Sequence, residues 1–132
     1  MGELLAEFLS RNPHQKFTQP GEFIGPFPSG APAIFAAQVA KLSHRAIFFG
    51  CVGNDDFARL IIERLRHEGV ITDGIHVMNN AVTGTAFVSY QNPQLRDFVF
   101  NIPNSACGLF TAEHIDKDLL KQCHLLHIVG AS

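Results

Sequence analysis

The chain has 132 residues, of which 46% are hydrophobic and 17% are charged, a balance typical of one soluble globular domain. The formal net charge is −2, and acidic and basic residues are mixed along the chain. This mixture excludes the basic stripe with which proteins neutralise nucleic-acid phosphates, so we expect no nucleic acid partner.

The sequence also argues against a membrane or disulfide-stabilised protein. Its apolar stretches, such as residues 46–52, are too short to span a bilayer, and the start lacks the basic flank of a signal peptide. We therefore expect a cytoplasmic protein without a membrane partner. The three cysteines, Cys51, Cys107 and Cys123, are irregularly spaced, which favours free thiols over a disulfide framework or a zinc site.

The first half of the chain alternates between expected strands and helices. Residues 3–9 read as a buried strand, and residues 11–28 read as a polar flap with short edge strands at 15–17 and 22–24. A largely buried helix is expected over residues 31–42, a strand over 46–52, and a helix from 57 to Gly69. Alternating strands and helices predict a parallel sheet covered by helices.

The second half begins with an expected hairpin. Its strands are residues 85–90 and 97–101, which follow a short apolar stretch at 75–77. A helix capped by Thr111 is expected to run to about Gln122, followed by a buried strand over residues 124–129. His124 and His127 would then lie on opposite faces of that strand, so we expect no metal site from this pair.

Two glycine-marked junctions between a strand and a helix carry the chemical information. In the first, Ser29-Gly30-Ala31-Pro32-Ala33, a glycine lets a small polar ligand approach the backbone, and the helix amino-terminus offers free N–H donors. Taken alone, this glycine could serve only the turn. The second junction, residues 50–58, reads Gly-Cys-Val-Gly-Asn-Asp-Asp-Phe-Ala.

Together these junctions resemble the signature region of the PfkB/ribokinase family of carbohydrate kinases. Further matches follow in order at residues 68–75 and 83–88, and residues 2–8 are similar to the end of the family's first strand. The resemblance therefore extends from Gly2 to Ser132. It implies an α/β fold: a partial ribokinase-like, Rossmann-type sandwich with a small β-lid at about residues 10–28.

The resemblance implies a sugar site at the first junction. It suggests that Glu7 accepts from a sugar hydroxyl, that Gly30 and Ala31 bring backbone amides to the ligand, and that Arg96 and Asn101 contribute from the hairpin. On the residues alone, Glu7 could be a solvated strand-end acid, and Arg96 and Asn101 could be surface side chains.

This sequence departs from the family pattern at three places. Ser29 replaces the first glycine of the first motif, Ile34 replaces an asparagine that contacts sugar hydroxyls, and Ala58 replaces the last glycine of the second motif. An isoleucine cannot donate a hydrogen bond, so the usual contact is lost at that position. A different sugar preference and a loss of binding are both compatible with these changes.

The part of the family pattern that transfers phosphate is missing. The resemblance places the catalytic aspartate in a Gly-Ala-Gly-Asp segment, which does not occur in this chain. No alternative phosphate-binding glycine motif is present either. We therefore expect ATP and Mg²⁺ to serve the full-length parent, and the chain itself to have no catalytic residue, no metal site and no activity.

We interpret the chain as the amino-terminal, sugar-binding part of an ATP-dependent kinase for a sugar or sugar acid, without its carboxyl-terminal ATP-binding part. One alternative is a nucleoside or hydroxymethylpyrimidine kinase of the same superfamily, and another is a non-catalytic sugar-binding or regulatory module. A nicotinamide-dependent oxidoreductase is disfavoured because the dinucleotide fingerprint is absent. We also expect a homodimer through the lid near residues 16–24, and aggregation of the isolated chain.

Overall fold

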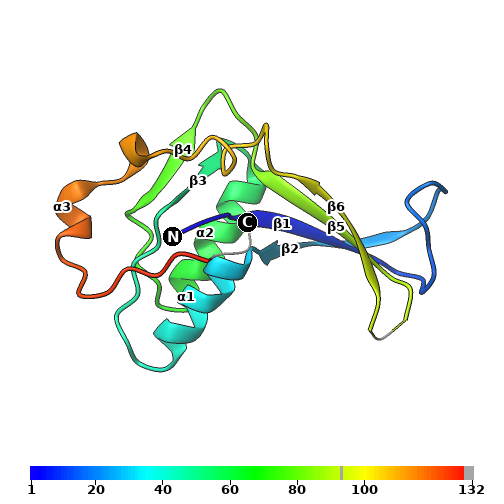
Figure 1. Cartoon of the computed structure of the whole chain (residues 1–132), viewed down its shortest axis with the longest axis horizontal. Coiled ribbons are helices and arrows are strands. Elements are labelled where there is room, and N and C mark those ends of the chain that lie inside the picture. Colours follow the sequence, from blue (N-terminus) through cyan, green and yellow to red (C-terminus); the bar gives the residue numbers. More distant parts are fainter. Residues whose placement is uncertain (93, 130–132) are drawn as a thin grey trace.

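The computed structural model describes residues 1–92 and 94–129 and confirms the expected α/β class. The strands are β1 (Leu5–Ser10), β2 (Phe23–Ser29), β3 (Gly50–Gly53), β4 (Ile75–Met78), β5 (Gly84–Tyr90) and β6 (Arg96–Asn101). The helices are α1 (Ala31–Lys41), α2 (Asp56–His67), the short 3-10 helix η1 (Ala112–His114) and α3 (Lys117–Leu120). Figure 1 shows β3, β4, α1 and α2 gathered in a body from which the other strands project as an arm.

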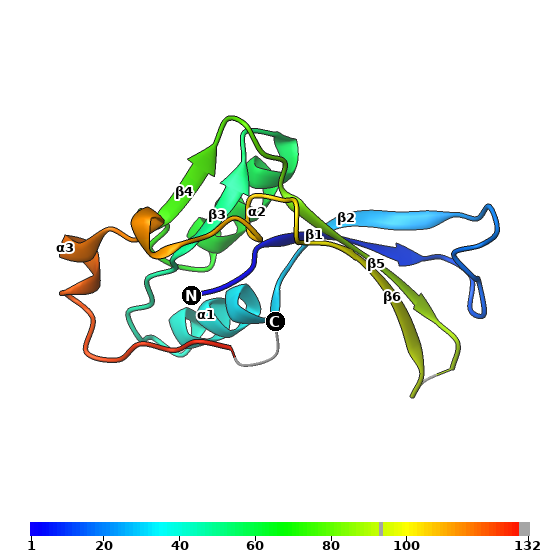
Figure 2. The same ribbon diagram turned by 45° about the horizontal axis from the view of Figure 1, so that its top comes forward.

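The arm is a four-stranded sheet with the strand order β2-β1-β5-β6. Its central pair, β1 and β5, is parallel, whereas β2 and β6 pair antiparallel at the two edges. The body contains the parallel pair β3 and β4. A hydrogen bond of 3.2 Å from the Gly2 N–H to the Phe49 carbonyl links the start of the chain to the segment before β3. The turned view in Figure 2 shows the arm extending away from both long helices.

The core lies where α1 and α2 meet the strands of the body. It consists of these buried side chains: Leu4, Ala33, Ala36, Ala37, Phe48, Val52, Ala58, Ile61, Leu65 and Val70. Helix α1 contributes only alanines to this list, and such small side chains let a helix approach its neighbours closely. Each large buried aliphatic side chain contributes about 1.5–3 kcal/mol by leaving water. The amino end of β1, through the preceding Leu4, and the start of α1 are thereby anchored to one packed unit.

The helices and the hairpin agree closely with the sequence-based prediction. Helix α1 starts directly after Gly30 and has a proline in its first turn, and α2 starts after the N-cap Asp55. Strands β5 and β6 form the expected antiparallel hairpin. In the lid, residues 22–24 lead into β2, but the edge strand expected at 15–17 is wrong, because these residues lie in the connection between β1 and β2 without strand pairing.

The strand expected at 46–52 is shorter than predicted. Strand β3 covers Gly50–Gly53, and residue Ile47 forms an isolated parallel bridge with Ile71. The expected buried helix at 31–42 also has an exposed side, on which Ile34 is 59% and Phe35 is 44% exposed. This side is open because no other element of the described chain covers it fully.

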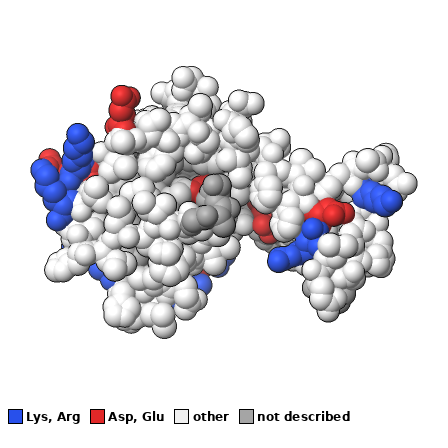
Figure 3. Space-filling view, viewed as in Figure 1, with Lys and Arg blue, Asp and Glu red and all other residues white. Residues whose placement is uncertain are grey.

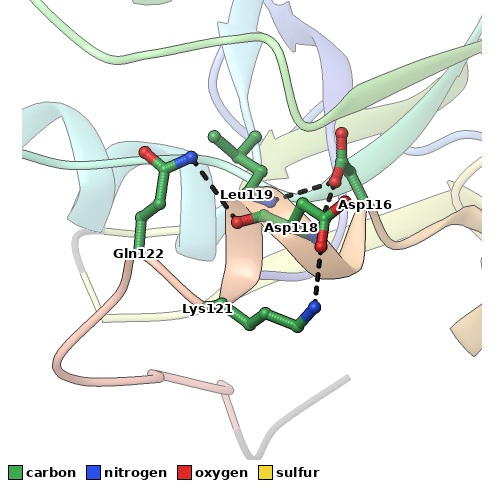
Figure 4. A network of polar contacts seen from close by, with 5 residues as sticks. All are labelled: Asp116, Asp118, Leu119, Lys121 and Gln122. Atoms are coloured by element: carbon green, nitrogen blue, oxygen red, sulfur yellow. Dashed lines mark hydrogen bonds and ion pairs between the residues drawn. The ribbon is translucent and has the colours of Figure 1, made fainter.

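The single helix predicted from Thr111 to Gln122 is wrong. The structure has η1 and α3 there, separated by Ile115 and Asp116 in extended conformations. The Asp116 carboxylate accepts from the N–H groups of Asp118 and Leu119 at 2.9 and 3.0 Å, as Figure 4 shows. An N-cap residue has non-helical dihedral angles, so Asp116 starts a new helix instead of continuing the old one.

The buried strand predicted over residues 124–129 is also wrong. These residues have no regular secondary structure, and Leu125 is 80% exposed. The segment contacts the rest of the chain through a 2.8 Å hydrogen bond from the Met1 ammonium to the His127 carbonyl and through the His127 ring, which stacks on Phe35 at 4.2 Å. A strand needs a continuous row of main-chain partners, and the described residues do not supply one here.

The surface carries both signs of charge. On the face shown in Figure 3, basic and acidic side chains are interspersed at both ends of the molecule. Within residues 1–92 and 94–129, every helix is too short or too polar to cross a membrane.

Candidate sugar site

The candidate site is built around Glu7 in β1. In the sheet, Glu7 lies between Phe27 of β2 and Ala86 of β5. The Ser29 hydroxyl, at the end of β2, donates to Glu7 Oε2 at 3.0 Å. Glu7 and Ser29 are both half-buried. The carboxylate is therefore held in one orientation while it keeps further lone pairs for a ligand.

Gly30 and Ala31 join this site to the start of α1. Gly30 has φ = +112°, and a Cβ placed on it would lie 2.5 Å from the Glu3 carbonyl oxygen. Only glycine suits this conformation and this close approach of β2 to β1. Gly30 provides no side-chain cap for α1, and Ala31 is exposed. The first N–H groups of a helix have no intrahelical partner and can bind oxygen ligands.

The sheet presents Glu7 on a partly aromatic face, on which its β5 partner Ala86 is buried. Because side chains alternate along a strand, Glu7 shares its face with Phe27 on β2 and with Phe98 and Phe100 on β6. These three rings are between 42% and 48% exposed, and Phe98 and Phe100 stack at 5.3 Å. The face next to Glu7 therefore offers apolar walls beside one negative charge.

The opposite face of the arm packs toward α2 through aromatic rings. Phe8 stacks on Phe87 at 5.1 Å and meets Phe57 of α2 edge-on at 5.7 Å. Phe23 meets Phe87 edge-on at 5.6 Å. These rings fasten the base of the arm to the body, which fixes the direction in which Glu7 points.

The structure does not bring Arg96 and Asn101 to Glu7. The Asn101 amide donates to Thr85 Oγ1 at 2.9 Å, and strand alternation places this pair on the face opposite Glu7. Arg96 lies on the same face of the sheet as Glu7, but it pairs with Tyr90. Along β5, Tyr90 lies four residues, or about 13 Å, beyond Ala86, which is the partner of Glu7. Its guanidinium group lies over the Tyr90 and Phe98 rings, at 5.8 and 5.6 Å from their centres.

Asp55 organises the second glycine-marked junction. Its carboxylate caps α2 by accepting from the Ala58 N–H at 2.9 Å, and it accepts from the Thr83 N–H at 2.8 Å and the Thr83 hydroxyl at 2.7 Å. The same hydroxyl accepts from the Gly53 N–H at 3.0 Å. Burial opposes ionisation of Asp55, but the hydrogen bonds from Thr83 and Ala58 outweigh burial and lower its pKa. Asp55 therefore stabilises the fold as the N-cap of α2.

A cavity of about 120 Å³ lies between α1 and α2, and Ser29 and Ile34 belong to its lining. Lys41, Arg64 and Glu68 also line it, and the Lys41 ammonium pairs with the Glu68 carboxylate at 2.9 Å. Ile34, which stands where the family resemblance places an asparagine, thus has an apolar side chain next to Ser29 on the cavity wall. The sequence interpretation treated Ser29 only as a departure from glycine and missed its contact with Glu7.

Metal-ligating side chains do not cluster in the part of the chain that the structure describes. No group of three or more His, Cys, Asp or Glu side chains that could hold a metal ion occurs in residues 1–92 and 94–129. The sequence has neither Gly-x-x-x-x-Gly-Lys-Ser/Thr nor Gly-x-Gly-x-x-Gly. What these residues can do chemically is bind and orient a hydroxylated ligand.

Known proteins share this arrangement. The sequence pattern described as "pfkB family carbohydrate kinase" matches residues 21–132. Fructokinase-1 of Zea mays is 32% identical over 126 residues, which are 96% of this chain and 39% of that protein. The chain thus spans about two fifths of the length of this relative.

Solved structures agree with the sequence relatives. An E. coli protein described as a "putative Ribokinase II" matches with a TM-score of 0.89 and 48% identity over 92% of this chain and 39% of that chain. A second structure of that protein is a complex with ATP and Mg²⁺. Fructokinase from Xylella fastidiosa matches with a TM-score of 0.75 and 35% identity over 89% of this chain and 37% of that chain.

These solved structures and this chain share one α/β fold. The chain belongs to the pfkB family of carbohydrate kinases.

Proposed function

We propose that this chain forms the sugar-binding part of an ATP-dependent carbohydrate kinase, which transfers a phosphoryl group from ATP to a hydroxyl of a sugar or sugar acid. The observation that carries the proposal is the Glu7 carboxylate, held by Ser29 beside Gly30 and the open amino-terminus of α1. A carboxylate accepts strongly from sugar hydroxyls, and free helix N–H groups donate to their oxygens. The site thus offers both kinds of hydrogen-bonding partner that a polyol needs.

A ketohexose such as fructose is the first sugar to test. The relatives from Zea mays and Xylella fastidiosa are fructokinases, which supports this choice. The aromatic rings of Phe27, Phe98 and Phe100 border the Glu7 face and would contact the apolar C–H faces of a sugar ring.

ATP would supply the phosphoryl group in the whole kinase, and Mg²⁺ would offset the charge of its phosphates. The E. coli relative has been solved with both, which supports this part of the proposal. In this proposal the part of the chain that the structure describes binds and orients the acceptor sugar, and the ATP site lies in the rest of the kinase. The expected cytoplasmic location stays a prediction.

We also propose a homodimer formed through the lid. Strand β2 is an edge strand of the arm, and its side chains Phe23, Ile24 and Phe27 are 37%, 37% and 42% exposed. Unpaired edges with exposed apolar side chains are sites of association, so a second copy of β2 or of the preceding residues 16–22 is the expected partner.

Sugar binding is tested by titrating the chain with D-fructose, D-ribose and adenosine, with binding followed by NMR. We expect fructose or ribose to bind, and Glu7→Gln to weaken binding at least about tenfold because a charged acceptor is lost. The matched control is Glu22→Gln, which changes an exposed acid paired only with exposed Arg11. A preference for adenosine would support the nucleoside-kinase alternative, and a Glu7→Gln variant that binds sugar normally would contradict the proposed site.

Phosphoryl transfer is tested in an intact kinase in which residues 1–132 replace the matching part of the E. coli relative, to which the chain is 48% identical. ATP-dependent phosphorylation of the sugar that binds would support the kinase function. Sugar binding in a folded chimera without phosphorylation would favour the alternative of a non-catalytic sugar-binding or regulatory module.

A further inference from the structure

Ser29 differs from the other residues at the first junction because it contacts Glu7 through its side chain. We propose that Ser29 is a positioning residue, which orients Glu7 so that the two side chains together accept from adjacent hydroxyls of a neutral polyol and disfavour sugar acids. This inference rests on the proposed sugar-binding function and names the substrate class of the same site.

The backbone fixes the position from which the Ser29 side chain extends. Ser29 pairs with Leu5 across the β1–β2 ladder, and Glu7 pairs with Phe27 two residues further along. The next residue, Gly30, is confined by its close approach to the Glu3 carbonyl. The Ser29 backbone therefore stays in place if the Glu7 carboxylate rotates, and the 3.0 Å hydrogen bond favours one orientation of the Glu7 side chain.

The direction of this hydrogen bond decides which ligand groups the pair can bind. A serine hydroxyl has one proton, and here it is donated to Glu7 Oε2. What remains is the set of carboxylate lone pairs and the two lone pairs of the Ser29 oxygen, all of which are acceptors. Neighbouring hydroxyls of a polyol can donate to both, whereas the carboxylate of a sugar acid cannot donate and is repelled by Glu7.

The nearby cations do not compensate for this negative charge, because Lys41 and Arg64, which line the cavity with Ser29, pair with Glu68. Arg96, the basic residue of the sequence-predicted site, lies about 13 Å along the arm and is placed over the Tyr90 and Phe98 rings. Ile34, beside Ser29 on the cavity wall, is apolar. The Glu7 and Ser29 side chains therefore make this part of the site negatively charged and rich in hydrogen-bond acceptors.

The test measures the affinity of the chain for D-fructose and for the open-chain pair D-sorbitol and D-gluconate, by NMR titration with the Glu7 side-chain carbon observed directly. We expect wild type to bind sorbitol more tightly than gluconate. Ser29→Ala should weaken fructose binding about five- to tenfold, because the carboxylate loses its preferred orientation. Ser29→Thr keeps a hydroxyl and should restore most of the affinity.

The matched control is Ser10→Ala. Ser10, at the end of β1, also donates a side-chain hydrogen bond, to the Ser89 hydroxyl at 3.2 Å. It lies on the other face of the arm, so its replacement should leave fructose binding unchanged. The Glu7 carbon signal without sugar should change in Ser29→Ala and not in Ser10→Ala, which separates a local effect from misfolding.

Unchanged fructose binding in Ser29→Ala, or gluconate binding as tight as sorbitol binding, would overturn the inference while leaving the proposed function in place. Failure of wild type to bind any of the sugars would overturn the proposed function itself, and the inference with it.

Discussion

At the scale of single residues, side-chain oxygens join segments that lie far apart in sequence. Ser29 joins the end of β2 to Glu7, and Thr83 joins the start of β5 to Asp55. The second contact is the more buried, since Thr83 is only 2% exposed. A buried donor that loses its acceptor costs free energy, so we expect Asp55 to matter for stability.

Replacing Asp55 with asparagine should lower the free energy of unfolding by about 1–2 kcal/mol at neutral pH, because an amide nitrogen would face the Thr83 or Ala58 N–H donors. Urea denaturation followed by circular dichroism at low protein concentration measures this change. The matched control is Asp116→Asn, which alters the exposed cap of α3 and should cost only a few tenths of a kcal/mol.

The pH dependence follows from the lowered pKa of Asp55. The folded-state pKa lies below the ordinary value of 3.8, so the carboxylate stabilises the fold fully above that value and loses its contribution as the pH falls through the folded-state pKa. The stability gap between wild type and Asp55→Asn should therefore narrow below pH 3.8. A gap that stays constant into strong acid would contradict this assignment.

At the scale of secondary-structure elements, the position of α1 depends on both of its ends. At the carboxyl end, the Lys41 ammonium pairs with Glu68, the C-cap residue of α2, whose side chain is 8% exposed. Burial opposes ionisation of Glu68, but hydrogen bonds and charges from Lys41 and Arg64 outweigh it and lower the pKa. At the amino end, Gly30 lets α1 start directly beside β1.

Replacing Gly30 with alanine should destabilise the chain by about 3 kcal/mol or more, because the new Cβ would lie 2.5 Å from the Glu3 carbonyl in a strained conformation. The change should also displace Ser29 from Glu7 and reduce sugar binding. Chemical denaturation gives the stability, and the Glu7 carbon signal reports the displacement.

Gly69 provides the matched control for this substitution. It also has a positive φ, +87°, but a new Cβ at Gly69 would lie 3.8 Å from the Ala40 methyl group, an ordinary contact distance. Gly69→Ala should cost only the conformational penalty of about 1 kcal/mol. If the two substitutions lowered the free energy of unfolding equally, the close approach of Gly30 to Glu3 would be unimportant for stability.

At the scale of the whole molecule, apolar surface remains open in two regions. One region comprises the outer side of α1 and residues 124–128. A cavity of about 480 Å³ lies between α1 and residues 122–127. The side chains of Leu125, Leu126 and Ile128 in this region are 80%, 50% and 63% exposed. The other region is the β2 edge of the arm. Exposed apolar patches of this kind promote association.

We expect the chain to self-associate at micromolar concentration, with two distinguishable contributions. Ile128→Glu should reduce the fraction of aggregates larger than a dimer, because it places a charge in the open apolar region beside α1. Ile24→Glu should instead reduce a dimer formed through the lid. Sedimentation velocity across a concentration series measures both.

The control is Val82→Glu, since Val82 is 64% exposed but lies outside both regions. It should leave the distribution of species unchanged. A dilute monomer with a sharp cooperative melt, which remains monomeric when concentrated, would contradict both the aggregation and the lid dimer.

Local patterns in the sequence were sufficient for α1, α2, the β5–β6 hairpin and the two glycine-marked junctions. Helix periodicity, caps and turn residues depend on near neighbours, and the described structure shows each of these features where the pattern predicts it. The same reasoning failed over residues 111–129. Asp116 starts a separate helix there, and the last segment lacks strand partners.

The sequence by itself determined the α/β class and the family, and it singled out Glu7 and Gly30 as candidates for one site. Only the tertiary structure decided that Ser29 binds Glu7, that Asn101 lies on the opposite face, and that Arg96 lies far along the arm. The physical reason is strand register. A shift of one residue turns every side chain to the other face, and the irregular pairing between Glu7 and Leu9 arises from contacts between segments distant in sequence.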